Sequence, residues 1–185
     1  MSLMDLVRSA RSIRRYDESQ KISEEQLRTL VDIARFCPCG GNKQSLRYRV
    51  VADPAECGVV FPNIAWAGAL PDWPGPSEGE RPTGYIAVCS EGKPGTDVGI
   101  AAQTIQLAAS EMAFGACMLG SIKRDEIQKA LSIPDRYEIK LLIALGKPAE
   151  KVVIDNASAG DDLRYYRTED DTHHVPKLSL EDILI

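Results

Sequence analysis

Apolar and polar residues recur along the chain with periods that predict a mixture of helices and strands. Ser23 and Gln26 have the spacing of a capping box, and the apolar residues that follow recur on one face of a helix. A longer helix is expected over residues 97–114, with a wide alanine-rich face that lets another helix approach closely and Gly115 as its C-cap. The remaining apolar runs predict strands over residues 47–52, 85–90, 116–119 and 138–145, and helices from residue 53 and over residues 123–131.

These elements predict a single α+β domain over residues 1–185, with a central mixed or antiparallel sheet flanked by helices. We expect about four or five strands in this sheet. A proline-rich loop at residues 62–83 is expected to be an ordered surface excursion, and residues 147–185 are polar apart from an amphipathic end. The first strand is not followed by GxGxxG, which disfavours a Rossmann dinucleotide fold.

Charge and composition exclude several classes of protein. The net charge of −5 gives no support to nucleic-acid binding. No apolar run is long enough for a membrane span, and the first residues lack the features of a secretory signal, so we expect a cytoplasmic protein. The five cysteines are scattered, which favours neither a disulfide framework nor a zinc site.

Basic residues crowd one short stretch, residues 11–15, here called the arginine segment. Arg11 and Arg14 can present guanidinium forks to phosphate oxygens, and the hydroxyl of Ser12 can complete the cradle. The other interpretation is a solvated basic turn, which the charge pattern taken alone favours.

Two further stretches have the composition of ligand-binding loops. Residues 38–44, here called the glycine loop, combine two glycines that allow close backbone approach with the amides of Asn42 and Gln44, which suit the edge of a heterocycle. Residues 118–122 run from a strand end into a helix start, where backbone N–H groups can face an electron-rich atom. An ordinary connecting loop, and a Ser121 helix cap, are the simpler interpretations.

Taken together and in this order, these stretches resemble the nitroreductase family. The arginine segment with Tyr16, the glycine loop, the helix over residues 97–115, Leu119-Gly120 and residues 133–150 carry the resemblance, and residues 165–177 are similar to the family's closing segment. The resemblance implies a nitroreductase-like fold that binds flavin mononucleotide (FMN) in an intertwined homodimer. Residues 151–185 are then a C-terminal extension that packs on the partner subunit. It also implies ping-pong electron transfer from NAD(P)H to nitroaromatic, quinone or similar small electrophilic acceptors.

The resemblance assigns flavin contacts to a defined set of residues: Arg11, Ser12, Arg14, Pro38, Cys39, Gly40, Asn42, Gln44, Leu119, Gly120 and Lys177. The arginine segment would hold the phosphate and the pyrimidine end, and the partner's glycine loop would cover the ring. The strand end would place N–H groups near N5, and the lysine would close over the phosphate. The flavin carries the chemistry, so no protein nucleophile or base is required.

The chain departs from the family pattern at several positions. Ala10 and Cys39 stand where arginine and serine are frequent, Ser45 follows Gln44 where a proline and tryptophan are usual, and no basic residue follows Lys177 closely. The loss of two basic partners predicts weak flavin binding, or binding that depends on Arg164 or Arg167.

Three alternatives remain open at this point. A flavin reductase-like relative would act on quinones, enones or halogenated aromatics, with Trp66 and Trp73 as pocket walls or, as we prefer, loop anchors. A non-catalytic flavin-binding or redox-sensing protein would use Cys39. A hydrolase that pairs Cys39 with His173 or His174 is disfavoured, because no oxyanion motif such as GxSxG is present.

Overall fold

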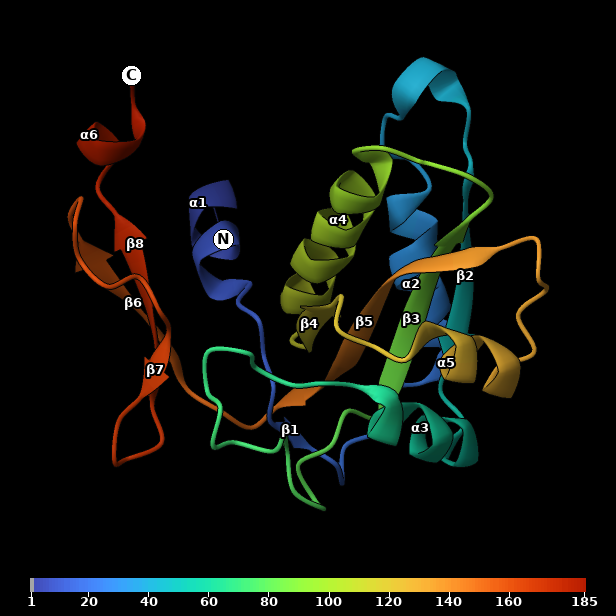
Figure 1. Ribbon diagram of the computed structural model, residues 1–185, viewed down its shortest axis with the longest axis horizontal. Coiled ribbons are helices and arrows are strands. Elements are labelled where there is room, and N and C mark those ends of the chain that lie inside the picture. Colours follow the sequence, from blue (N-terminus) through green and yellow to red (C-terminus); the bar gives the residue numbers. More distant parts are fainter. Residues whose placement is uncertain (1) are drawn as a thin grey trace.

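The computed structural model describes residues 2–185, so Met1, where the expected domain begins, lies outside the described residues. The fold is α+β, as the sequence predicts: a five-stranded antiparallel sheet with helices on its faces, and a separate three-stranded sheet beside α1 (Figure 1). The helices are α1 Leu3–Ser9, α2 Glu24–Ala34, α3 Pro54–Val60, α4 Asp97–Glu111, α5 Arg124–Ala130 and α6 Leu180–Ile183. The strands are β1 Tyr16–Asp17, β2 Leu46–Val51, β3 Gly84–Ser90, β4 Gly115–Leu119, β5 Glu138–Pro148, β6 Val152–Ala157, β7 Tyr166–Arg167 and β8 His173–Leu178.

The main sheet has the order β1-β5-β3-β2, with β4 also paired to β5. Every residue of β3 is buried, because alternate side chains enter two different cores. Tyr85 and Ala87 face the cluster that α3, α5 and the long loop cover, whereas Ile86 and Val88 face α2 and α4. Burial on both faces explains why this antiparallel strand has a continuous apolar sequence.

Helix α4 packs against α2 through small side chains, as predicted. Ala101, Ala102 and Ala108 of α4 are buried in one cluster with Leu27 and Leu30 of α2. The capping box of Ser23 and Gln26 is present and starts α2.

The predicted end of α4 is wrong. The helix stops at Glu111, and Ala113 rather than Gly115 adopts the left-handed conformation, with φ of 60°. Gly115 instead begins β4, where a Cβ atom would lie 2.7 Å from the side chain of Ile13. The glycine is therefore required for close packing and not for a helix cap.

The sequence predicts the amphipathic end, where α6 lies, but neither α1 nor the strands of the C-terminal extension. Helix α1 begins at a capping box formed by Ser2 and Asp5. In the C-terminal extension, β6 pairs in parallel with β8, and β7 joins the other edge of β8. Within residues 2–185, no helix is both long enough and apolar enough to cross a membrane.

Candidate functional site

The arginine segment runs between α1 and β1 and is fastened to the main sheet. Ile13 is buried and donates its N–H to the carbonyl of Ala116 in β4 at 3.0 Å. The side-chain amide of Gln106 donates to the carbonyl of Ala10 at 3.0 Å, which fixes the segment against the C-terminal half of α4. The backbone that carries the arginines is therefore held at defined points.

Arg11 faces an open groove of about 460 Å³, which Arg8 and Lys147 also line. Its Nη2 donates to the carbonyl of Val7 at 2.7 Å, and its Nε is buried with no partner among residues 2–185. Burial lowers the pKa of Arg11 from its ordinary value, yet a guanidinium in a protein remains charged. Three cations and one carboxylate, Glu150, line the groove, and an unpaired cationic donor in such a mainly basic groove suits a phosphate group.

Arg14 points to the C-terminal extension. Its guanidinium carbon lies 4.8 Å from the centre of the Tyr165 ring, and its Nη1 lies 3.4 Å from Nε2 of His173. The carboxylate of Glu150 accepts the backbone N–H groups of Arg14 and Arg15, and this side chain is almost completely buried. The backbone and the side chain of Arg14 are thus both held.

A second basic cluster surrounds Trp73. Arg15 and Arg167 lie over its ring, at 6.0 and 4.6 Å from the ring centre. Arg167 also donates to Glu150 at 2.7 Å, and Arg15 pairs with Asp171 at 3.0 Å. Arg167 is therefore committed to a buried ion pair, and exposed Arg164 pairs with Asp162, so the structure shows neither as a free phosphate ligand.

The glycine loop lies at the other end of α4. The N–H of Gly40 donates to Oδ1 of Asp97, the first residue of α4, at 3.1 Å. Gly41, Asn42 and Gln44 all have positive φ, of 58°, 52° and 48°. Left-handed backbone is strained for residues with a Cβ, less so for asparagine than for glutamine, and such strain clusters at functional sites. The loop is exposed from Gly40 to Gln44, so its amides are accessible to a ligand.

Part of the glycine loop borders a small cavity of about 140 Å³. Pro38, Cys39 and Gln44 line it from the loop, and Tyr48 and Ala101 line it from β2 and α4. Cys39 accepts the N–H of Gln44 at 3.3 Å. The loop residues that the sequence analysis selected are thus brought together.

One chain does not bring the glycine loop to the arginine segment. Asp97 and Gln106, which hold the two segments, are nine residues apart in α4. At 1.5 Å per residue this separation is about 14 Å along the helix axis. In Figure 1 the short blue helix at the top, Gly40–Asn42, lies beyond one end of α4, whereas the chain between α1 and β1 passes the other end.

The remaining predicted residues lie in two places. Leu119 is buried at the end of β4, the strand that pairs through Ala116 with Ser12 of the arginine segment. Gly120 follows this strand and is exposed. Lys177 is exposed on β8, opposite Asn156 of β6, and its ammonium group forms no hydrogen bond or ion pair with the part of the chain that the structure describes.

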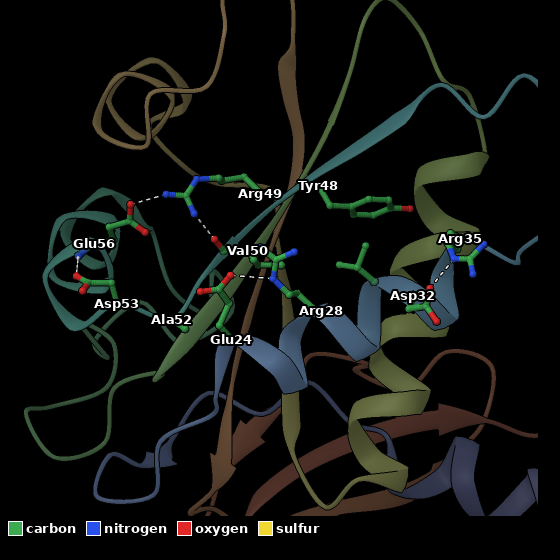
Figure 2. A pocket seen from close by; sticks show the side chains of 11 residues that line it. Glu24, Arg28, Asp32, Arg35, Tyr48, Arg49, Val50, Ala52, Asp53 and Glu56 are labelled. Atoms are coloured by element: carbon green, nitrogen blue, oxygen red, sulfur yellow. Dashed lines mark hydrogen bonds and ion pairs between the residues drawn. The ribbon is translucent and has the colours of Figure 1, made fainter.

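The largest groove, of about 890 Å³, lies over α2 and β2 and is not the candidate site. Figure 2 shows its charged side chains turned to one another. Arg28 pairs with Glu24, and Arg35 with Asp32. Such exposed pairs are typical of a solvated surface and leave little unpaired charge to attract a ligand.

The structure also decides between the alternatives for the histidines and tryptophans. His173 is buried beside Arg14 and His174 pairs with Asp155, whereas Cys39 lies at the far end of α4, so one chain does not bring Cys39 to either histidine. Trp66 is buried in the core and Trp73 is packed against it, so both are loop anchors. Among residues 2–185 no cluster of potential metal ligands is found.

Comparison with known proteins shows the family. The chain matches the Nitroreductase family model over residues 7–64 and 94–147, more than half of its length, and it belongs to this family. A candidate NADH dehydrogenase/NAD(P)H nitroreductase of Archaeoglobus fulgidus is 26% identical over 160 residues, which cover 80% of this chain and 86% of the relative.

Solved structures show the same fold. A nitroreductase family protein of Clostridium difficile superposes with a TM-score of 0.65 at 21% identity, over 81% of this chain and 86% of that one. A candidate nitroreductase of Exiguobacterium sibiricum, solved in complex with FMN, gives a TM-score of 0.67 at 19% identity, over 81% and 90% of the two chains.

Sequence reasoning missed four residues that shape the site: Asp97, Glu150, Tyr165 and His173. Asp97 was expected only as a helix start, and Glu150 only as the end of a family motif. The histidine lies in a polar tail whose strands have no clear alternation. The family resemblance brings Lys177 of this tail to the flavin phosphate, but it does not indicate that Tyr165 and His173 contact Arg14.

Proposed function

We propose that this protein is an FMN-dependent oxidoreductase that passes electrons from NAD(P)H to small electrophilic acceptors, such as nitroaromatics or quinones, by a ping-pong route. One observation carries the proposal. In a fold shared with an FMN-bound protein, the residues that suit a flavin lie at opposite ends of α4, an arrangement that a second copy of the chain would complete.

The residues present fit the cofactor. Arg11 has a buried unpaired Nε beside a basic groove, and the Ser12 hydroxyl has no partner within residues 2–185, so both can serve a phosphate. Nη1 is the one side-chain atom of Arg14 that makes hydrogen bonds with that part of the chain, and Tyr165 covers one face of the guanidinium, which leaves the rest of its fork for the pyrimidine edge. The exposed amides of Asn42 and Gln44, from the partner copy, would complete the shared site.

A homodimer is supported by the apolar side chains that one chain leaves exposed. They lie on α1, on the α2 and α4 surface near the glycine loop, and on the C-terminal extension: Leu3, Met4, Val7, Ile33, Phe36, Ile100, Leu180, Ile183, Leu184 and Ile185. Exposed apolar surface of this extent marks an interaction site. Of residues 151–185, expected to pack on the partner subunit, Tyr165 and His173 contact their own chain, whereas Lys177 and residues 179–185 would reach the partner.

The chain's own part in the reaction is binding and electrostatics. When bound, the flavin supplies the hydride chemistry. Arg14 would supply a permanent cation at the pyrimidine edge of the flavin, which would stabilise the reduced form more than the oxidised form. One face of the site must stay open, so that donor and acceptor can enter in turn.

The test is an absorption spectrum of the purified protein with and without added FMN, followed by gel filtration. We expect flavin bands and a dimer. Oxidation of NADH with a quinone or nitroaromatic separates an enzyme from a flavin-binding sensor. A colourless monomer that takes up no FMN would refute the proposal.

A further inference from the structure

We infer that Tyr165 and His173, from the C-terminal extension, act as positioning residues that clamp the Arg14 guanidinium in the orientation in which it meets the cofactor. This inference rests on the proposed function, in which Arg14 must be oriented to bind the pyrimidine edge of the flavin. It adds residues to that function, since neither Tyr165 nor His173 is among the predicted flavin contacts.

The first support is the geometry around Arg14. The Tyr165 ring lies against one face of the guanidinium, at 4.8 Å from its carbon, within the range of a cation–π contact. The imidazole of His173 meets the Nη1 edge at 3.4 Å, a long hydrogen bond. One face and one edge are therefore occupied, and the remaining nitrogens of the fork are left open.

The clamp is itself held in place. The ring centres of Tyr165 and His173 are 5.2 Å apart, and the Tyr165 hydroxyl accepts the N–H of Ala69 at 3.2 Å. The backbone N–H of His173 donates to the carbonyl of Lys151 at 2.9 Å, next to Glu150, which binds the backbone of Arg14. Both rings are thus fixed to the frame that carries the arginine.

The charges around His173 favour a neutral imidazole. His173 is 1% exposed, and two cations, Arg14 and Arg167, lie close to it together with His174. Burial first, and then these neighbours, lower the pKa of His173 to about 4. Near neutral pH the unprotonated Nε2 can accept a hydrogen bond from Arg14. Protonation would instead set two cations against each other.

The experiment uses the full chain and two variants of one position. His173→Phe keeps a ring beside Tyr165 and removes the acceptor, whereas His173→Gln keeps an acceptor that does not titrate. His174→Gln is the matched control, because His174 pairs with Asp155 and does not contact Arg14. The Kd for FMN, measured by fluorescence quenching from pH 8 to pH 4.5, is the first readout.

We expect His173→Phe to raise the Kd about tenfold at pH 7.5, whereas His173→Gln and His174→Gln stay near the wild type. Below pH 5 the wild type and His174→Gln should lose affinity more steeply than His173→Gln. This difference between variants is independent of the titration of the FMN phosphate itself. Equal affinities and equal pH profiles in all four proteins would overturn the inference.

A second readout needs no flavin. The Arg14 side-chain Nε–H signal, assigned in ¹⁵N spectra by its loss in Arg14→Lys, should move toward the position of a solvated arginine in His173→Phe and in Tyr165→Leu. An unmoved signal would refute the clamp even if FMN binds. If the wild type binds no FMN but the signal moves, the proposed function fails and the clamp stands.

Discussion

The arginine segment and the glycine loop are held in opposite ways. The arginine segment is fixed by buried backbone hydrogen bonds to β4 and by the carboxylate of Glu150. The glycine loop is exposed over residues 40–44, is held by hydrogen bonds with the side chains of Asp97 and Arg47, and has three residues with positive φ. The difference indicates that one half of the site is preorganised within a chain, whereas the other half is shaped to meet something outside it.

The largest expected effect is on the free energy of unfolding, from a substitution that disrupts the packing of the arginine segment on β4. Gly115→Val should lower the free energy of unfolding by about 3 kcal/mol or more, because a Cβ there would lie 2.7 Å from the Ile13 side chain. Urea denaturation of the apoprotein measures this. Gly58→Ala is the matched control, since its Cβ meets nothing within 4 Å and it lies within α3. Equal losses in the two variants would contradict the close packing at Gly115.

Removal of the Arg14 cation should change both the affinity for FMN and the potential of the bound flavin. Arg14→Ala should weaken FMN binding about 100-fold and lower the flavin potential, because a charge-assisted contact to the pyrimidine edge is lost. Titration calorimetry and a dye-linked redox titration measure the two quantities. Arg28→Ala, at an exposed helix pair, should change neither. An Arg14→Ala protein with unchanged affinity and potential would remove Arg14 from the mechanism.

The buried histidine predicts a pH dependence of apoprotein stability. The pKa of His173 is lowered to about 4 in the folded chain, whereas its ordinary value is 6.5. The unfolded chain therefore binds more protons between these values, and stability is full above pH 6.5 and falls as the pH drops toward 4. The loss should be on the order of 2 kcal/mol in the wild type. The His173→Gln variant should lack this loss, because glutamine does not titrate. If the free energy of unfolding falls equally with pH in the two proteins, His173 does not titrate between pH 6.5 and 4.

The smallest effect concerns the strained glycine loop. Gln44→Gly should raise the free energy of unfolding by about 0.5–1 kcal/mol, because glycine adopts a φ of 48° without strain. The same change removes the amide and should raise the Kd for FMN. Thermal unfolding and FMN titration of one sample measure both. A gain in stability without loss of affinity would mean that the side chain of Gln44 has no part in the site.

The sequence predicted the main sheet because its signals are local. The capping box of Ser23, the proline after Asp53 and the apolar runs of β3 and β5 depend on neighbours in the chain, and all four lie where expected. The role of Gly115 was predicted wrongly because it depends on a contact with Ile13, about one hundred residues away in the sequence. A contact at this separation leaves no periodic trace.

The candidate site was predictable only as separate pieces. Motif order identified the arginine segment and the glycine loop, yet it did not show that α4 holds them apart. The polar sequence of the extension concealed β6 and β8, because the partly buried strands of a small sheet lack a clean alternation. The clamp around Arg14 was therefore beyond sequence reasoning.

The carboxylate of Glu150 joins groups that are made at very different times. It binds the backbone of Arg14 near the start of the chain and the side chain of Arg167 near its end. A protein emerges from the ribosome with its N-terminus first. Glu150 is therefore made long after Arg14, and its ion pair can form only when Arg167 has also been made. The arginine segment is thus made long before the carboxylate that holds its backbone has been made and paired with Arg167.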